Sequence, residues 1–189
     1  GYFLDFHCAP RRQYTITLAG EIEIGLGDGT VRRFGPGTVL LAEDSLDQHA
    51  PLLSANADQW RDWSPEHFAG FVERDGCDGA IVTFRASGVK WSYARYGDDM
   101  VVTEVAEKRA ISPDATAGIY YWRCARDCFN AIAKMMQAER RVNGEFYLAP
   151  SFNEMIVDGK RVIAYPVPRM WGLGTPADLK ATVEAHPWK

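Results

Sequence analysis

The chain has 189 residues, of which 47% are hydrophobic and 24% are charged, and its formal net charge is −4 at pH 7. This composition is ordinary for a soluble globular protein, and the length allows one sizeable domain or two very small ones. The charge leaves no basic footprint and no apolar run reaches the roughly 18 residues of a membrane span, so we expect neither nucleic acid nor a membrane as partner.

The four cysteines indicate free thiols in a reducing compartment. Cys8, Cys77, Cys124 and Cys128 form no CxxC pair and have no histidine at zinc-finger spacing. Cys124 and Cys128 lie one helical turn apart, which suits half a metal site, but small side chains on a helix face are the commoner use of free cysteine. No signal peptide is visible, so we expect a cytoplasmic protein. The chain begins at Gly1 without a methionine, which we interpret as a fragment or a processed chain.

The first 37 residues are dominated by β patterns. Residues 14–18 are a β-branched and aromatic run, and residues 21–24 alternate strictly between polar and apolar. Asp28-Gly29 is a hairpin turn signal, residues 31–34 form the returning strand, and Gly35-Pro36-Gly37 ends the segment. We therefore expect a small antiparallel β segment at the front of the chain.

After Gly37 predicted strands alternate with predicted helices. Ser64 as N-cap and Pro65 at the first helical position predict a helix to about Asp75, and Thr175-Pro176 predicts the start of a last helix. Two further helices are expected at 123–140 and at 152–158, the second closed by Gly159. The expected strands are a buried one at 51–56, others at 79–84, 117–122 and 161–167, and an exposed pair at 91–96 and 101–105. This order predicts an α/β fold with a mixed, largely parallel sheet and flanking helices.

Polar residues follow several of these predicted strands. Asp58 comes directly after 51–56, and a carboxylate at the end of a buried parallel strand can hold a divalent cation against phosphate oxygens, although it can equally cap a turn. Glu107-Lys108 pairs an acceptor for sugar hydroxyls with a cation for a phosphate, or else forms a surface ion pair. Gly118 near the start of a strand suggests close approach by a ligand or by backbone. Asn143-Gly144-Glu145 is a turn that projects a carboxylate, or simply a loop.

In their order these stretches resemble the sugar-1-phosphate nucleotidyltransferases, the family of the glucose-1-phosphate thymidylyltransferases and other NDP-sugar pyrophosphorylases. The resemblance covers residues 38–189 and rests on residues 52–59, 78–84, 90–94, 107–108, 115–121, 143–147 and 171–176. It implies a partial nucleotide-diphospho-sugar transferase fold, which is Rossmann-like. It also implies Mg²⁺-dependent transfer of a nucleotidyl group from an NTP to a sugar-1-phosphate, with an NDP-sugar as product.

The resemblance assigns roles by position. Asp58 matches the magnesium-binding aspartate, and Glu107 and Lys108 match a Glu-Lys pair around the sugar and its phosphate. The remaining substrate-binding positions are Thr116, Gly118 at the sugar, Asn143, and Glu145 at the sugar hydroxyls.

Two departures from the family pattern predict an impaired or inactive, truncated chain. Leu173 stands immediately before the Gly-Thr-Pro turn, where many members have a second metal-binding aspartate, and residues 1–37 contain no glycine-rich phosphate loop. Without the family's first strand, one edge of the sheet would expose backbone donors and apolar surface, which predicts pairing or aggregation unless the front hairpin covers it. The oligomeric state is open.

Residues 1–44 resemble part of a small bacterial cupin, a β-barrel family that usually holds a metal with two or three histidines and a carboxylate. His7 and His49 are the candidate ligands, with Gln13 as a neighbour. Residues 39–44 belong to both resemblances, as a strand in the cupin and a helix in the nucleotidyltransferase. We therefore expect a fusion of a partial cupin-like segment, residues 1–37, with the nucleotidyltransferase-like domain, residues 38–189. The alternatives are a cupin-type metal or small-ligand binding module and a non-catalytic interaction domain.

Overall fold

The computed structural model describes residues 14–16, 22–25, 31–34, 39–41, 48–56 and 58–185, and in the first four ranges it describes the backbone alone. The elements in chain order are β1 (Tyr14–Ile16), β2 (Ile22–Gly25), β3 (Val31–Phe34), β4 (Val39–Leu41), β5 (Leu52–Ala55), β6 (Gln59–Arg61), α1 (Pro65–Asp75), β7 (Gly79–Arg85), β8 (Ser92–Tyr96), β9 (Val102–Glu107), β10 (Asp114–Trp122), α2 (Ala125–Gln137), the 3₁₀ turn η1 (Ala149–Ser151), α3 (Phe152–Val157), β11 (Val162–Pro166), β12 (Met170–Gly172) and α4 (Pro176–Ala185).

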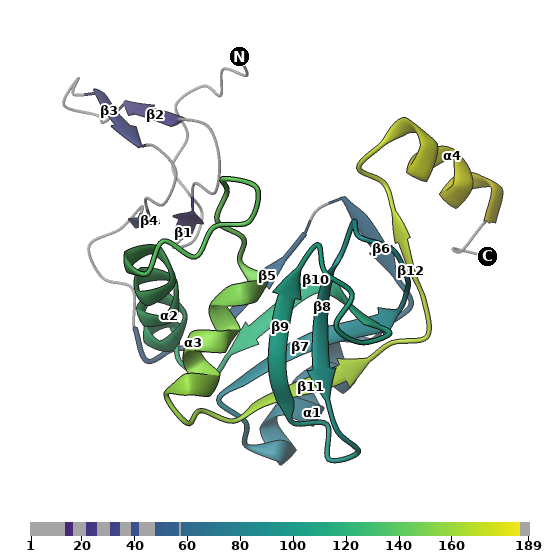
Figure 1. The fold of residues 1–189 in the computed structure, drawn as a ribbon, viewed down its shortest axis with the longest axis horizontal. Coiled ribbons are helices and arrows are strands. Elements are labelled where there is room, and N and C mark those ends of the chain that lie inside the picture. Colours follow the sequence, from purple (N-terminus) through teal and green to yellow (C-terminus); the bar gives the residue numbers. More distant parts are fainter. Residues whose placement is uncertain are drawn as a thin grey trace.

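A six-stranded sheet lies at the centre of the fold (Figure 1). The strand order is β11-β7-β10-β8-β9, and β5 pairs with the second half of β10. The α/β fold with a mixed sheet is confirmed, but the expectation of a largely parallel sheet is wrong, because only β11 and β7 run parallel in this sheet. The short connection of residues 97–101 explains the antiparallel pairing of β8 with β9, since a parallel neighbour needs a crossover of a dozen or more residues, and β10 lies antiparallel between β7 and β8.

Helices cover both faces of the sheet and close two cores. On one face α2 and α3 pack over β10, where the rings of Trp122 and Phe152 stack with centroids 4.8 Å apart. On the other face α1 supplies Phe68 and Val72, which pack against β7 and β10. β7 is buried on both faces from Gly79 to Phe84, as expected of a central strand, and its buried residues are apolar apart from Thr83.

The helix boundaries follow the predicted capping signals. Ser64 Oγ accepts a hydrogen bond from the His67 backbone N–H at 3.1 Å, and α1 ends at Gly76 in the left-handed conformation, with φ of 73°. The other three helices lie within or near their predicted ranges, and Gly159, with φ of 74°, follows α3 as expected. Local side-chain chemistry therefore fixes both ends of α1, whereas α2 and α3 begin without a side-chain capping hydrogen bond.

Two predictions of strand burial are wrong. β5 was expected to be buried, but its residues alternate between half-buried and exposed, and Leu53 is 51% exposed, because among the described strands β10 alone pairs with it. β8 and β9 form the expected pair but are not exposed, since Tyr93, Ala94 and Val105 are buried. Asn153 of α3 accepts a hydrogen bond from the Val105 backbone N–H and donates one to its carbonyl, which fixes α3 against β9.

The front of the chain forms two small antiparallel pairs, of which the β2–β3 pair is the predicted hairpin and the β1–β4 pair was not predicted. β1 pairs with β4, β2 pairs with β3, and neither pair joins the six-stranded sheet. Residues 39–41, which the two resemblances treat differently, form a strand. None of the described strands closes a barrel, and the predicted turn at Asp28-Gly29 lies outside the described residues.

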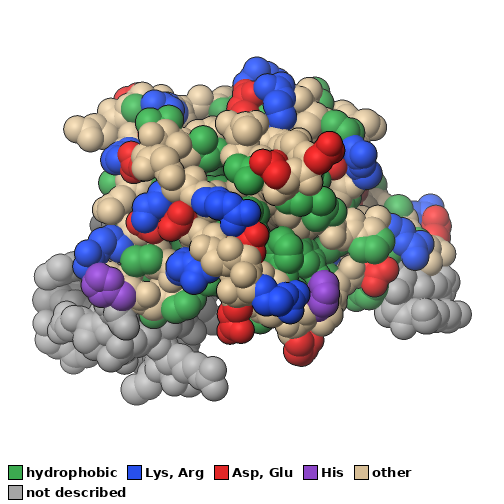
Figure 2. Space-filling view, turned by 90° about the horizontal axis from the view of Figure 1, so that it is seen from below, with side chains coloured by type: hydrophobic (Ala, Val, Ile, Leu, Met, Phe, Trp, Pro, Cys, Tyr) green, Lys and Arg blue, Asp and Glu red, His purple; other side chains and the backbone are tan. Residues whose placement is uncertain are grey.

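Figure 2 shows one face of the molecule from below, with Lys and Arg interspersed among Asp and Glu around hydrophobic side chains. This face carries no continuous stripe of one charge, in line with the absence of a basic footprint in the sequence. None of the helices in the described ranges has the length and apolar character needed to cross a membrane.

Candidate functional site

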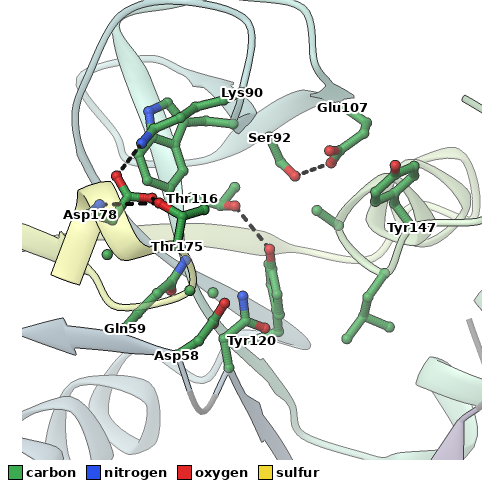
Figure 3. Close-up of a pocket in the computed structure, with 17 residues that line it drawn as sticks. Asp58, Gln59, Lys90, Ser92, Glu107, Thr116, Tyr120, Tyr147, Thr175 and Asp178 are labelled. Atoms are coloured by element: carbon green, nitrogen blue, oxygen red, sulfur yellow. Dashed lines mark hydrogen bonds and ion pairs between the residues drawn. The ribbon is translucent and has the colours of Figure 1, made fainter. Parts of the chain in front are cut away.

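A cavity of about 420 Å³ opens beside the middle of β10 (Figure 3). Its walls come from the ends of β5, β8 and β9, from β6, from the segment before α3 and from the start of α4. The lining residues are Asn56, Asp58, Gln59, Lys90, Trp91, Ser92, Glu107, Thr116, Gly118, Tyr120, Tyr147, Leu148, Ala149, Gly172, Gly174, Thr175 and Asp178.

An irregularity in β10 gives the cavity its floor. The pairing of β10 with β7 shifts register between Thr116 and Tyr120, and Gly118 between them has φ of 64°. A Cβ at Gly118 would lie 2.5 Å from Asn56 Nδ2 and 2.5 Å from Gln59 Oε1, so the close approach of these amides requires glycine here. The Asn56 backbone N–H donates to the Gly118 carbonyl at 2.8 Å, which ties the end of β5 to this point.

Arg61 of β6 holds the floor in place. Its guanidinium donates to the Ala117 carbonyl at 2.5 Å, to Gln59 Oε1 at 2.8 Å and to the Asn56 carbonyl at 3.1 Å. Burial lowers the pKa of Arg61, with the charge of Asp58 acting in the opposite direction. Arg61 therefore orients the polar floor without itself lining the cavity.

Asp58 lines the cavity, although the reason given from the sequence is wrong. It follows an antiparallel edge strand rather than a buried parallel one. Its carboxylate faces the backbone of the segment after β12, so that a Cβ at Gly174 would lie 2.5 Å from Asp58 Oδ2. Leu173, at the position where many members of the resembled family have a second metal-binding aspartate, donates its backbone N–H to the Asp58 carbonyl at 2.7 Å and is absent from the cavity lining.

Asp58 fits a magnesium site that is completed by substrate phosphates, but it does not belong to a set of side chains that could hold magnesium without them. The described residues contain no group of three or more His, Cys, Asp or Glu side chains able to hold a metal ion by themselves. Magnesium is usually held by one or two carboxylates together with substrate phosphates, and keeps several waters. Asp58 suits an ion that arrives with phosphates, not a resident ion in a protein cage.

Glu107 and its neighbours form a second polar group at the opposite end of the cavity. Ser92 Oγ donates to Glu107 Oε2, and Thr116 Oγ1 and the Tyr120 hydroxyl are 2.9 Å apart. Burial raises the pKa of Glu107, opposed by the hydrogen bond from Ser92 and the charge of Lys108. Burial also raises the pKa of Tyr120 to about 12, so this phenol stays protonated and can donate to a ligand.

Lys108 does not line the cavity. Its ammonium donates to the Tyr147 hydroxyl and lies 4.6 Å from the centroid of that ring, and the hydrogen bond raises the pKa of Lys108. Tyr147 in turn donates to Glu145 Oε2 at 2.6 Å. Glu145 and Asn143 are exposed on the turn outside the cavity, so Tyr147 is what connects Lys108 and Glu145 with the cavity wall.

The sequence analysis did not identify a third polar group in the cavity, formed by Lys90, Thr175 and Asp178. Lys90 Nζ lies 3.0 Å from Asp178 Oδ1, and Thr175 Oγ1 is 2.8 Å from Asp178 Oδ2 (Figure 3). The Lys90 ammonium also lies 4.4 Å from the centroid of the Trp91 ring. A signal existed, because a threonine N-cap followed three residues later by a carboxylate marks a capped helix start, but its nearness to Lys90 depends on the tertiary fold.

The two histidines predicted for a cupin-type site have no place in this cavity lining as the structure describes it. His7 lies outside the described residues, and His49 is exposed with its Nε2 3.1 Å from Arg126 Nη2. Cys77, Cys124 and Cys128 are free thiols, and burial raises the pKa of Cys128 to about 12.

Comparison with solved structures identifies the fold. A nucleoside-diphosphate-sugar pyrophosphorylase from Vibrio cholerae RC9 matches with a TM-score of 0.61 and 23% identity, over 71% of this chain and 56% of that one. A Bacillus anthracis protein described as a glucose-1-phosphate thymidylyltransferase, solved in complex with a sucrose, matches with a TM-score of 0.60 and 14% identity, over 74% and 55%. This chain therefore spans about half the length of these structures. No family model matches the sequence, and no curated protein matches it either. At these identities the likeness establishes a nucleotidyltransferase-type fold.

Proposed function

We propose that this chain carries the sugar-phosphate half of a sugar-1-phosphate nucleotidyltransferase site. The observation that carries the proposal is the meeting of Asp58, Glu107, Thr116 and Gly118 around one cavity at the β10 irregularity. Asp58 precedes β6, Glu107 ends β9, and Thr116 and Gly118 belong to β10, so three segments of a fold shared with NDP-sugar pyrophosphorylases contribute to the cavity. The ligand would be a sugar-1-phosphate or the sugar end of an NDP-sugar.

The chemistry of the cavity supports a sugar as ligand. A volume of about 420 Å³ is within the common range for small-molecule sites. Glu107, Ser92, Thr116 and Tyr120 offer hydroxyl and carboxylate groups in one wall, and such groups can donate to and accept from several sugar hydroxyls. A site with buried polar groups also rejects ligands that leave those groups unpaired, which gives specificity.

Asp58 is the residue that would hold a magnesium ion, and the ion would supply charge neutralisation for the phosphates of a bound nucleotide or NDP-sugar. The carboxylate lines the same cavity as the sugar-binding groups, which supports this position. We propose that magnesium alone binds weakly, because one carboxylate makes a poor site without phosphate oxygens.

We further propose that the 189-residue chain by itself binds sugar phosphate but has little turnover. Residues 1–37 contain no glycine-rich phosphate loop. Nucleotidyl transfer depends on positioning the triphosphate, and positioning can account for about 7–11 kcal/mol of a barrier. Transfer from an NTP to a sugar-1-phosphate is thus the related activity, and binding is the property to measure first.

The test compares two glutamates of one strand. Glu107 faces the cavity, whereas Glu104 of β9 pairs with Arg95 and Arg109 outside it. Glucose-1-phosphate at about one hundred times its Kd should stabilise the wild type by about 2.7 kcal/mol, or roughly 5–10 °C in Tm. Glu107→Gln should lose most of this shift and Glu104→Gln should retain it. No saturable shift with any sugar phosphate, or equal loss in both variants, would overturn the proposal.

Thermal-shift measurements with metal ions separate this proposal from a cupin-type module and from a non-catalytic interaction domain. Stabilisation by iron, nickel or manganese that disappears in His7→Ala would support a cupin-type module, and no response to any ligand would support an interaction domain.

We also propose that the front β segment is a unit separate from the α/β domain, because β1 to β4 pair only with one another. Since β4 pairs with β1, this unit includes residues 39–41. Recovering one continuous reading frame across residues 37–46 in the native transcript would support a natural fusion, and failure to recover it would refute one.

A further inference from the structure

The proposed ligand carries a phosphate, and a protein cation that reaches the cavity would favour its binding. Of the Lys and Arg residues that the structure describes, Lys90 alone lines it. Lys108, the residue that the family resemblance assigns to the phosphate, is absent from the lining and its ammonium is held by Tyr147.

Lys90 is suited to exchange partners. It enters from the segment before β8, and its side chain is 57% exposed. Asp178 Oδ1, at 3.0 Å, accepts one of the three hydrogen bonds that the ammonium can donate. The ring of Trp91 lies beneath it, which limits the directions in which the side chain can move.

Asp178 can stay in place without Lys90. Its second oxygen is 2.8 Å from Thr175 Oγ1, and its backbone N–H donates to the same hydroxyl at 3.1 Å. These contacts belong to the first turn of α4, so they hold the carboxylate whether or not the ammonium is present. A phosphate that approaches Lys90 therefore meets a fixed negative charge beside it.

We infer that Lys90, and not Lys108, binds the phosphate of the sugar phosphate, and that Asp178 competes with that phosphate for the Lys90 ammonium. The inference rests on the proposed function and names the phosphate subsite within it. It places the phosphate at the Lys90 end of the cavity and the sugar hydroxyls at the Glu107 end (Figure 3).

Two consequences follow from the charges. Removing the ammonium should weaken binding of the phosphate ester but leave binding of the neutral sugar unchanged, because a neutral ligand has no charge for Lys90 to meet. Removing the Asp178 charge should strengthen binding of the phosphate ester, since like charges in close contact repel. The second effect should shrink at high salt, because both groups are partly exposed.

The test is calorimetric titration of the full 189-residue chain with glucose-1-phosphate and with glucose. Lys90→Met should lower affinity for glucose-1-phosphate about tenfold or more, the size of a charge-assisted hydrogen bond, and leave the glucose affinity unchanged. Lys90→Gln, which keeps a polar side chain, should show the same selective loss. Asp178→Asn keeps the side-chain shape and should raise affinity for glucose-1-phosphate about threefold or more at low salt.

Two controls make the outcome specific. Lys134→Met removes an ammonium of α2 that pairs with Asp158 after α3, and should change neither affinity. A larger loss in Lys108→Met than in Lys90→Met, or equal losses for both ligands in Lys90→Met, would overturn the inference while the proposed function stands. If the wild type binds neither ligand, the proposed function fails and the inference fails with it.

Discussion

Replacing Gly118 with alanine tests whether the β10 irregularity shapes the cavity. The residue has φ of 64°, a conformation that costs an L-residue about 1–2 kcal/mol. The new Cβ would also lie 2.5 Å from atoms of Asn56 and of Gln59, and overpacking of this kind typically costs about 1–3 kcal/mol more. Gly118→Ala should therefore lower the free energy of unfolding by about 2–5 kcal/mol, the sum of these two effects.

Gly144→Ala is the matched control. Gly144 also has positive φ, 81°, but a Cβ there would meet no atom within 4 Å, so this variant isolates the backbone cost. Urea unfolding should place Gly144→Ala about 1–2 kcal/mol below the wild type, with Gly118→Ala clearly lower still. Ligand titration should show weakened sugar-phosphate binding in Gly118→Ala alone, because its Cβ displaces the cavity floor. Equal destabilisation of the two variants, with binding intact in both, would refute this account of the floor.

Three further predictions concern the wall, the floor and the core. The raised pKa of Glu107 means that its favourable contribution is complete below the ordinary glutamate pKa, about 4.3, and is lost as pH rises through the native value. Glu107→Gln should thus melt above the wild type at pH 7 but not near pH 4, and a constant difference across this range would contradict the prediction. Arg61→Lys should lose part of the fork of hydrogen bonds to Ala117 and Gln59 and cost about 1–3 kcal/mol in urea unfolding, whereas no change would mean that the fork is dispensable. Phe152→Ala should cost about 3–5 kcal/mol, because the ring is fully buried against Trp122, and a cost below about 1 kcal/mol would contradict the packing.

The elements that the sequence predicted well are those set by local chemistry. Ser64 and Pro65 start α1, and Gly159 follows α3, because a capping hydroxyl, a fixed φ and a left-handed glycine act within a few residues. Strand direction is different in kind. It depends on which strands meet across the sheet, so the alternation of strands and helices suggested parallel pairing, whereas β10 lies antiparallel to β5, β7 and β8, strands that do not directly precede it in the chain.

The residues of the candidate site likewise divide into those that the sequence indicated and those that only the fold brings together. Asp58 and Gly118 could be singled out because each lies at a strand end or a conformationally demanding position. Lys90 and Asp178 are separated by 88 residues and were not identified from the sequence. Nothing in a surface lysine and a first-turn aspartate reveals that α4 brings them together, because their contact follows from the placement of α4 after β12.

The end of β9 explains why Glu107 and Lys108 do not face the cavity together. Glu107 is the last residue of β9 and lies opposite Ser92 of β8, so the pairing of these two strands brings both side chains to the cavity. Lys108 follows the strand with φ of 52°, in the left-handed region, and its ammonium is held by Tyr147. Lys90 reaches the cavity from the segment before β8. The inferred phosphate-binding role of Lys90 therefore depends on how the segment before β8 and the start of α4 meet in the fold, and not on the neighbourhood of Glu107 and Lys108 in the sequence.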